Sequence, residues 1–344
     1  MANRTLFQDN ITWDGQEADQ IFSQPVFADP DLLNTVRVIP NIISKKKLAV
    51  DTGLEKILRA VNDCGRNPSG HLITLSELTI EVERVGFDLE QCALALEDGF
   101  LEQFLNKGNK IFDLDGTYIK TYLEGKIVDA LKLDLPRVIW FGDKALADVN
   151  YNMIDGFFKQ MFSLSATNPD MVAPVIPATL PDSSTEAGAR AIIAMFRGLY
   201  DKQTGALKSV PANRKRFIVN MEIAEALQDA YTTLSTLGGG NGDIFLRRNQ
   251  NGEGLDVFKY KNIDVVGMIH WTDIVETDFA GAQNLRMVLT ETQNLVVGTD
   301  RIQDLTEVLF EYHPYPRVNT LEANFKLGTQ VLVPTLTVYS IQAA

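Results

Sequence analysis

The amphipathic stretch from Thr117 to Leu133 constrains the fold of this 344-residue chain more than any other segment. Its apolar residues recur every four positions, at Ile119, Leu123, Ile127 and Leu131. This spacing places them on one face of a helix, as a stripe about 25 Å long. The sequence therefore predicts a long helix with one buried face. Pro136 is expected to end it, because proline cannot donate the hydrogen bond that continues a helix.

Residues 1–50 are predicted to form an extended arm. Three prolines within them break any long helix, and the apolar side chains are scattered among polar ones. Such an arm has little core of its own, so we expect its aromatic residues to lie against another surface, of the same chain or of a neighbour. These residues are Phe7, Trp13, Phe22 and Phe27.

Residues 65–88 are predicted to form part of an extended, two-stranded loop. A turn region with Arg66 and Asn67 is followed by alternating apolar and polar residues from Leu78 to Glu83, the period of two that a half-exposed strand requires. From Leu89 the period becomes helical, through Cys92, Ala93, Leu96, Phe100 and Phe104.

The second half of the chain is predicted to mix helices and strands. Ser183 and Glu186 form a capping box that opens one helix, and Asn220 is expected to cap a second. Strand patterns cover 216–219 and most of 262–340. Gly238, Gly239, Gly240 and Asn241 form a loop that is flexible by composition. The whole pattern indicates an α+β fold whose first and last segments share a domain.

The composition argues against a nucleic-acid-binding or membrane protein. The net charge is −13, with 45 acidic and 32 basic residues, whereas tight DNA binding needs a basic excess. The basic runs Lys45–Lys47 and Arg214–Arg216 are short enough for a solvated face or a guarded strand edge. No apolar run is long enough to span a membrane, no secretion signal is recognisable, and Cys64 and Cys92 are expected to be reduced.

One local motif favours an enzyme. The sequence Asp113-Leu-Asp115-Gly-Thr resembles the nucleophile loop of haloacid-dehalogenase-type phosphatases, and Gly142-Asp143 resembles their magnesium-binding loop. However, the amphipathic helix fills nearly all of the interval, leaving no room for the strand and crossover that should separate the two loops. We therefore expect Asp113 and Asp115 to lie at a turn and a helix start, and we expect no catalytic residue, metal or cofactor.

Four strings resemble, in order, segments of tailed-bacteriophage major capsid proteins, particularly those of phages infecting Bacteroidetes. They are 78–104, Val138–Asp143, Ile154–Phe157 and Asn294–Asp300. The resemblance implies the Hong Kong 97-type fold, with an arm at 1–50 and an extended loop at 65–88. It implies a peripheral domain formed by 89–162 and 301–344, which carries the long spine helix, and an inserted axial domain at 163–300.

The resemblance also implies a function. The chain would be a shell subunit that assembles with itself, as pentamers and hexamers, into an icosahedral head enclosing double-stranded DNA. Assembly would occur in the host cytoplasm, with scaffolding, portal and decoration proteins as further partners and with weak, non-specific DNA contact. Contacts between subunits would include Phe7, Trp13, Phe22, Phe27, Arg66, Asn67 and Gly238–Asn241. Encapsulins, which share the fold and hold enzyme cargo, are the alternative.

Overall fold

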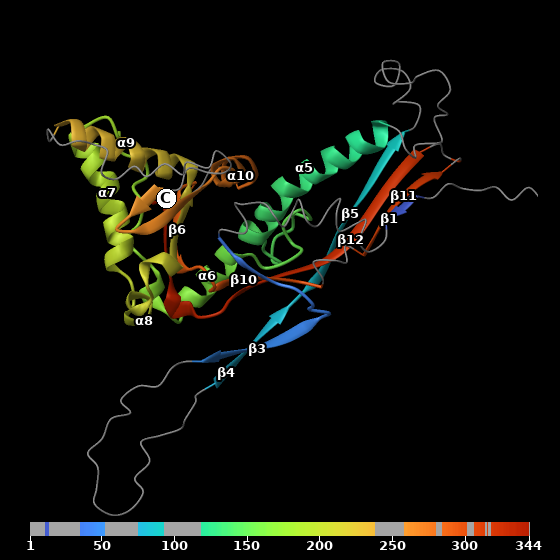
Figure 1. Ribbon diagram of the computed structural model, residues 1–344, viewed down its shortest axis with the longest axis horizontal. Coiled ribbons are helices and arrows are strands. Elements are labelled where there is room, and N and C mark those ends of the chain that lie inside the picture. Colours follow the sequence, from blue (N-terminus) through green and yellow to red (C-terminus); the bar gives the residue numbers. More distant parts are fainter. Residues whose placement is uncertain are drawn as a thin grey trace, which may run out of the picture.

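The computed structural model describes residues 11–13, 35–51, 75–92, 118–237, 258–279, 284–300, 306–313, 315 and 318–343. These residues form two main sheets and a separate hairpin (Figure 1). The six-stranded sheet has the order β1-β11-β12-β10-β2, with β5 also paired to β12. Its strands are β1 (Ile11–Trp13), β2 (Arg37–Ile39), β5 (Glu83–Cys92), β10 (Leu295–Thr299), β11 (Thr306–His313) and β12 (Val318–Val331).

The five-stranded sheet has the order β13-β9-β6-β8-β7. Its strands are β6 (Lys215–Asn220), β7 (Phe258–Tyr260), β8 (Ile263–Met268), β9 (Arg286–Glu291) and β13 (Thr337–Ile341). The two residues between β7 and β8, Lys261 and Asn262, both have positive φ angles (47° and 64°). This is the backbone form that two-residue hairpins prefer, because its twist matches that of the strands.

Helices cover both faces of the five-stranded sheet. They are α5 (Tyr118–Phe141), α6 (Phe157–Ser165), α7 (Glu186–Asp201), α8 (Gly205–Ser209), α9 (Met221–Leu237) and α10 (Trp271–Asp278). Short 3-10 turns lie at Pro169–Met171, Ala212–Arg214 and Pro334–Leu336. None of the described helices combines the length and apolarity needed to cross a membrane.

Two large cores result from this arrangement. Helices α7 and α9 pack on one face of the five-stranded sheet, where Phe196 and Leu227 are fully buried against Phe217. On the other face, α6, α10 and the end of α5 share a core with the six-stranded sheet. Trp140 and Trp271 lie at its centre, with ring centroids 4.7 Å apart. This second core joins the two sheets into one body.

Helix α5 confirms the predicted long helix but not its predicted end. It continues through Pro136 to Phe141. A proline inside a helix costs about 3 kcal/mol, because it removes a hydrogen bond and its ring crowds the preceding turn. The four residues Val138–Phe141 that follow are buried in the shared core. Burying each large apolar side chain contributes roughly 1.5–3 kcal/mol, so their packing outweighs the proline.

Three further local predictions are wrong. Residues 89–92 are the end of strand β5, not the start of a helix. Thr185, not Ser183, caps α7, and its hydroxyl accepts a hydrogen bond from the Gly188 N–H. Asn220 does not cap α9, because its side chain accepts from the Arg286 N–H and donates to Thr272 and to a backbone carbonyl.

The sheets cross the expected domain boundary at residue 300 in both directions. Strand β10, before the boundary, pairs with β12 and β2 in the six-stranded sheet. Strand β13, near the C-terminus, pairs with β9 in the five-stranded sheet. How the chain divides into arm, extended loop, peripheral and axial domains stays a prediction.

Candidate assembly surface

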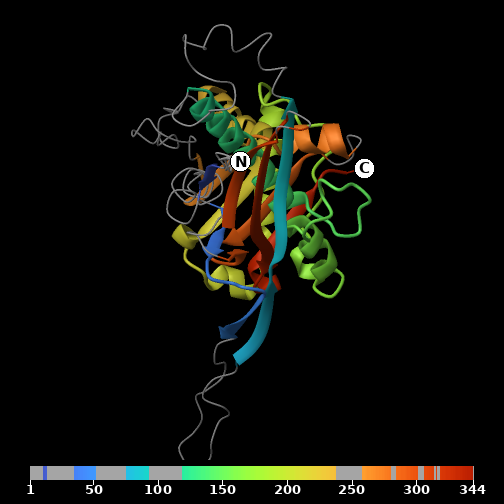
Figure 2. The same ribbon diagram turned by 90° about the vertical axis from the view of Figure 1, so that its right-hand side faces the viewer.

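A two-stranded hairpin projects from the body, where β3 (Lys45–Asp51) pairs with β4 (Leu75–Glu81) (Figure 1). The turned view shows β4 and β5 as one long, nearly continuous ribbon that leaves the body (Figure 2). Within the described residues, neither outer edge of the hairpin is paired with another strand. An isolated hairpin of two strands is marginally stable in water, so the stability of this hairpin depends on its attachment to the body.

Ion pairs line the hairpin's exposed face. Lys45 lies opposite Glu81 in the register, with Nζ 2.5 Å from the carboxylate, and Lys47 reaches Glu77 at 2.6 Å. The hydrogen bond and charge of Lys45 hold the pKa of Glu81 below its ordinary value. The short basic run is thus a solvated strand face, as expected from the sequence. Charges on open strands also discourage uncontrolled edge pairing.

The other face of the hairpin enters a small core of its own. Ile80 of β4 is completely buried there, and Ile42 is almost as well buried. The remaining buried members are Ile39, Val82 and Val296, with Leu48 and Leu332 packed against them. This core fixes the base of the hairpin, which we call the hairpin root.

Two glycines allow strands to approach closely at the root. A side chain at Gly298 of β10 would meet the ends of Ile42 and Ile80, each 2.8 Å from its Cβ. A side chain at Gly328 of β12 would overlap the backbone carbonyl of Glu81. Glycine inside a strand commonly marks such a close backbone approach. Both glycines therefore have a steric reason to be where they are.

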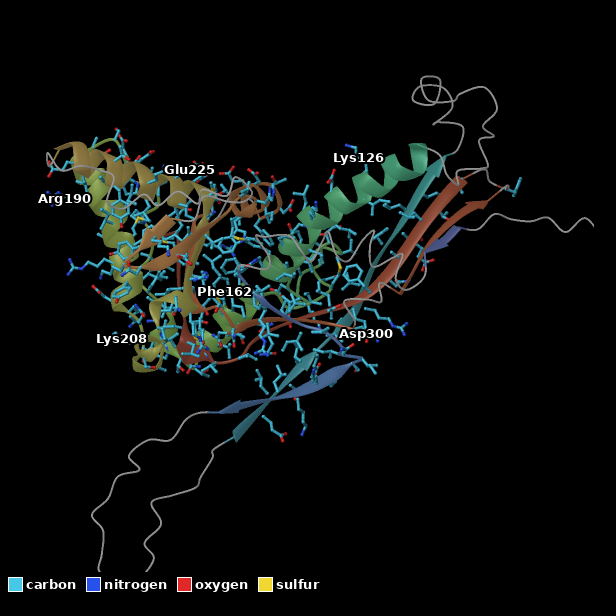
Figure 3. The ribbon with its side chains drawn as sticks, in the orientation of Figure 1. Lys126, Phe162, Arg190, Lys208, Glu225 and Asp300 are labelled. Atoms are coloured by element: carbon cyan, nitrogen blue, oxygen red, sulfur yellow. The ribbon has the colours of Figure 1, made fainter. Side chains whose placement is uncertain are left out.

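Polar contacts clamp the same point. The Nζ of Lys326 donates to the Asp300 carboxylate and to the carbonyl of Ile43, each at 2.8 Å. Figure 3 labels Asp300 close to the base of the hairpin. Backbone bonds add to the clamp, because the Val82 N–H donates to the carbonyl of Ser44 at 3.0 Å. The root is consequently anchored by apolar packing, strand approach and charge together.

A polar crevice of about 370 Å³ lies beside the root. Lys144 spans to Glu83 at 2.9 Å, and Lys159 pairs with Asp143 at 2.8 Å. Burial raises the pKa of Asp143, but Lys159 and the Ala145 N–H lower it by more, so its pKa lies below the ordinary 3.8. The charged groups thus neutralise one another. In the described part of the chain, no three His, Cys, Asp or Glu residues are placed to hold a metal ion.

The second acidic loop on which the phosphatase interpretation rests does not have the required position. Asp143 follows helix α5 instead of a strand, and its carboxylate is engaged by Lys159 and Ala145. Asp113 and Asp115 lie outside the described residues. In the phosphatases that the motif resembles, the two acidic loops follow strands of one parallel sheet, and Asp143 does not follow a strand.

Most of the predicted contact residues also lie outside the described part of the chain. These are Phe7, Phe22, Phe27, Arg66, Asn67 and Gly238–Asn241. Trp13 is in β1, at the edge of the six-stranded sheet, opposite Val308 of β11. The arm thus contributes strands to the chain's own sheet. The described residues do not test whether the predicted residues contact neighbouring subunits.

The sequence patterns did not indicate the hairpin root. The strand that pairs with β4 there is β3, nearly all of which lies within the residues predicted to form the arm. The signal that could have found it is the pair of single glycines, Gly298 and Gly328, inside apolar strand patterns. Lys326 carried no local signal, because its partners Asp300 and Ile43 are distant in sequence.

No protein-family model and no curated protein sequence matches this chain, but solved structures are similar to it. One is the satellite phage P4 procapsid including the size determination (Sid) protein. It has a TM-score of 0.53 and 11% identity, covering 93% of this chain and 96% of that one. The capsid of an empty GTA particle has a TM-score of 0.50 and 13% identity, covering 91% and 90%. The capsid of Myoviridae phage XM1 has a TM-score of 0.50 and 10% identity, covering 90% and 90%.

The chain has the fold of tailed-phage capsid proteins. The likeness covers nine-tenths or more of this chain. It confirms the mixed helix-and-strand class that the sequence predicted. At this level of identity it concerns the capsid fold alone.

Proposed function

We propose that this protein is the major capsid protein of a tailed bacteriophage, related to those of phages infecting Bacteroidetes. In this proposal it assembles with itself into the icosahedral head that encloses double-stranded DNA. The observation that carries the proposal is the projecting hairpin, firmly clamped at its root in a chain with the capsid fold. A rigidly attached element whose strand edges are open fits a role in contacting neighbouring copies.

Shell assembly needs many modest contacts that symmetry repeats. A subunit in pentamers and hexamers meets slightly different neighbours, and an extended element accommodates the difference better than a flat interface. Each contact buries little area, but the closed lattice sums them. The hairpin supplies reach, and the two-sheet body supplies the rigid unit that is repeated.

The charge of the chain fits a DNA container. A net charge of −13 disfavours tight binding to packaged DNA, so we propose weak, non-specific contact. Assembly is proposed to take place in the host cytoplasm, with scaffolding, portal and decoration proteins as further partners. No catalytic activity is proposed. The arm at 1–50, the loop at 65–88, the peripheral domain at 89–162 and 301–344, and the axial domain at 163–300 remain part of this proposal.

Electron microscopy of the purified full-length protein, followed by nuclease treatment, tests the function. Icosahedral particles of uniform size are expected, with heads from infected cells protecting double-stranded DNA. Uniform shells that hold an enzyme and no DNA would support the encapsulin alternative. A protein that forms no particle under any assembly condition would contradict both.

A further inference from the structure

Arg286 is a partly buried cation that has no counter-charge among the residues that the structure describes. It begins strand β9, and its guanidinium carbon lies 4.4 Å from the ring centre of Phe158 and 4.8 Å from that of Phe141. Phe162 adds a third ring at 6.0 Å. Among the described residues, no carboxylate and no hydrogen-bond acceptor meets the guanidinium, and its Nε is buried without a partner. Burial alone lowers the pKa of Arg286 to about 10.

Other shielded arginines of the described chain have a carboxylate partner, although the Nε of Arg137 is also buried without a hydrogen bond. Arg216 lies 2.9 Å from Asp264, and Arg137 lies 3.0 Å from Asp134. Removing a cation from water is costly unless an anion pairs with it, and contacts with aromatic rings recover only part of that cost. Arg286 therefore differs from these arginines in a way that the described residues of its own subunit do not explain.

The surroundings of Arg286 resemble the rim of a contact site. Phe162, labelled in Figure 3, is 38% exposed although it packs on Tyr339 with ring centres 5.4 Å apart. Val172 bridges to the same tyrosine and is 39% exposed. Phe162 lies beside the shielded guanidinium and Val172 lies beside Tyr339, so these two exposed apolar side chains would exclude water when a partner docks. We call Phe162, Val172 and Arg286 the Arg286 patch.

We propose that the Arg286 patch is a contact between copies of this chain, in which the guanidinium receives a carboxylate side chain from a neighbouring copy. The proposal rests on the proposed shell function, which surrounds each subunit with identical copies. Charge complementarity selects the occupant. Acidic residues exceed basic ones by 45 to 32, so another copy presents mainly carboxylates. A guanidinium binds a carboxylate through two parallel hydrogen bonds, which fixes orientation as well as attraction.

The test compares Arg286→Met with Arg190→Met in the full-length protein. Methionine keeps an unbranched stem against the rings and removes the charge. Arg190 is the matched control, because it is exposed and already paired with Glu186 at 2.7 Å. For Arg286→Met we expect a thermal midpoint of dissociated subunits equal to or above wild type. We expect its critical concentration for assembly to rise at least about tenfold, while the control assembles as wild type does.

Each other outcome is informative. If wild type forms no shells, the proposed function fails; if Arg286→Met assembles like wild type, only the Arg286 contact fails. Should Arg286→Met not fold, Arg286→Gln removes the charge but keeps a polar end, and unchanged assembly of that variant overturns the proposal. Inorganic phosphate that raises the thermal midpoint of wild-type subunits but not of Arg286→Met would indicate a free anion instead. In a wild-type shell at high resolution, a neighbour's carboxylate is expected within about 4 Å of the guanidinium.

Discussion

Gly328 lies where strand β12 passes beneath the backbone carbonyl of Glu81. The obstacle there is main chain, which cannot rotate away as a side chain does. At Gly298 the nearest atoms are the ends of Ile42 and Ile80, which have some freedom to move. The two glycines thus differ in how much a methyl group would disturb the root. Such differences follow from three-dimensional approach and are invisible in sequence.

Gly328→Ala is expected to destabilise the subunit by roughly 3 kcal/mol, because the new methyl group forces β12 and the hairpin root apart. The measurement is urea unfolding of dissociated subunits. Gly205→Ala is the control, since a Cβ there meets nothing within 4 Å. That variant is expected to be neutral or slightly more stable. Equal stability of the two variants would contradict the close approach at the root.

The lowered pKa of Asp143 predicts that the stability of the subunit depends on pH. Its pKa is lower in the folded state than its ordinary value of 3.8, so its contribution to stability is present above pH 4 to 5 and is lost as pH falls through the folded value. Asp143→Asn is expected to cost about 1 kcal/mol at neutral pH, because the Lys159 pair is partly exposed. The difference between the variant and wild type should shrink below pH 4.

Asp170 is the control for this experiment. Its pair with Lys202 is long, 3.7 Å, and the carboxylate is largely exposed. Asp170→Asn is therefore expected to leave the free energy of unfolding at neutral pH close to the wild-type value. A pH-independent difference between Asp143→Asn and wild type would mean that the carboxylate charge is not what matters there.

At the scale of elements, regular patterns predicted helices and strands well, while exceptions were decided by packing. The four-residue spacing predicted α5, alternation predicted β4, and β8 lies where a strand was predicted. Residues 89–92 fitted a helix equally well in sequence, but they extend β5 alongside β12 over ten paired residues. A short apolar run does not distinguish the two forms by itself. Pro136 shows the same limit, because a rule based on local sequence takes no account of how the residues after the proline are buried in the core.

Pro136→Ala is expected to raise the free energy of unfolding by about 1 kcal/mol. The substitution restores a donor for the carbonyl of Lys132 and relieves ring crowding, which together outweigh the packing that the half-buried ring provides. Pro177→Ala is the control, because Pro177 is exposed and lies in an irregular segment before α7. There alanine only adds freedom to the unfolded chain, so a small decrease in stability is expected. Urea unfolding of both variants measures the two changes in the free energy of unfolding, which are expected to have opposite signs.

At the scale of the whole molecule, the missing information was which strands share a sheet. Strand β13 joins β9 although about fifty residues separate them, and the six-stranded sheet unites segments from both ends of the chain. No local pattern carries that pairing. The predicted α+β class needed only the mixture of periods and is confirmed. The predicted arm, in contrast, includes residues that pack into the cores of the body.

The length of the dispensable arm is the last prediction. Residues 35–44 belong to the body, because Val36, Ile39 and Ile42 are 4%, 8% and 1% exposed, and β2 pairs with β10. Burial of three such side chains contributes roughly 5–8 kcal/mol, comparable with the whole stability of a typical domain. A chain lacking 1–44 is therefore expected to unfold. A chain lacking 1–34 loses only strand β1 among the described residues, and it is expected to remain folded by circular dichroism yet to form few closed shells by microscopy. Normal shells from the chain lacking 1–34 would show that the arm is not needed for assembly. Loss of folding in that chain would show that residues before 35 belong to the body's own core.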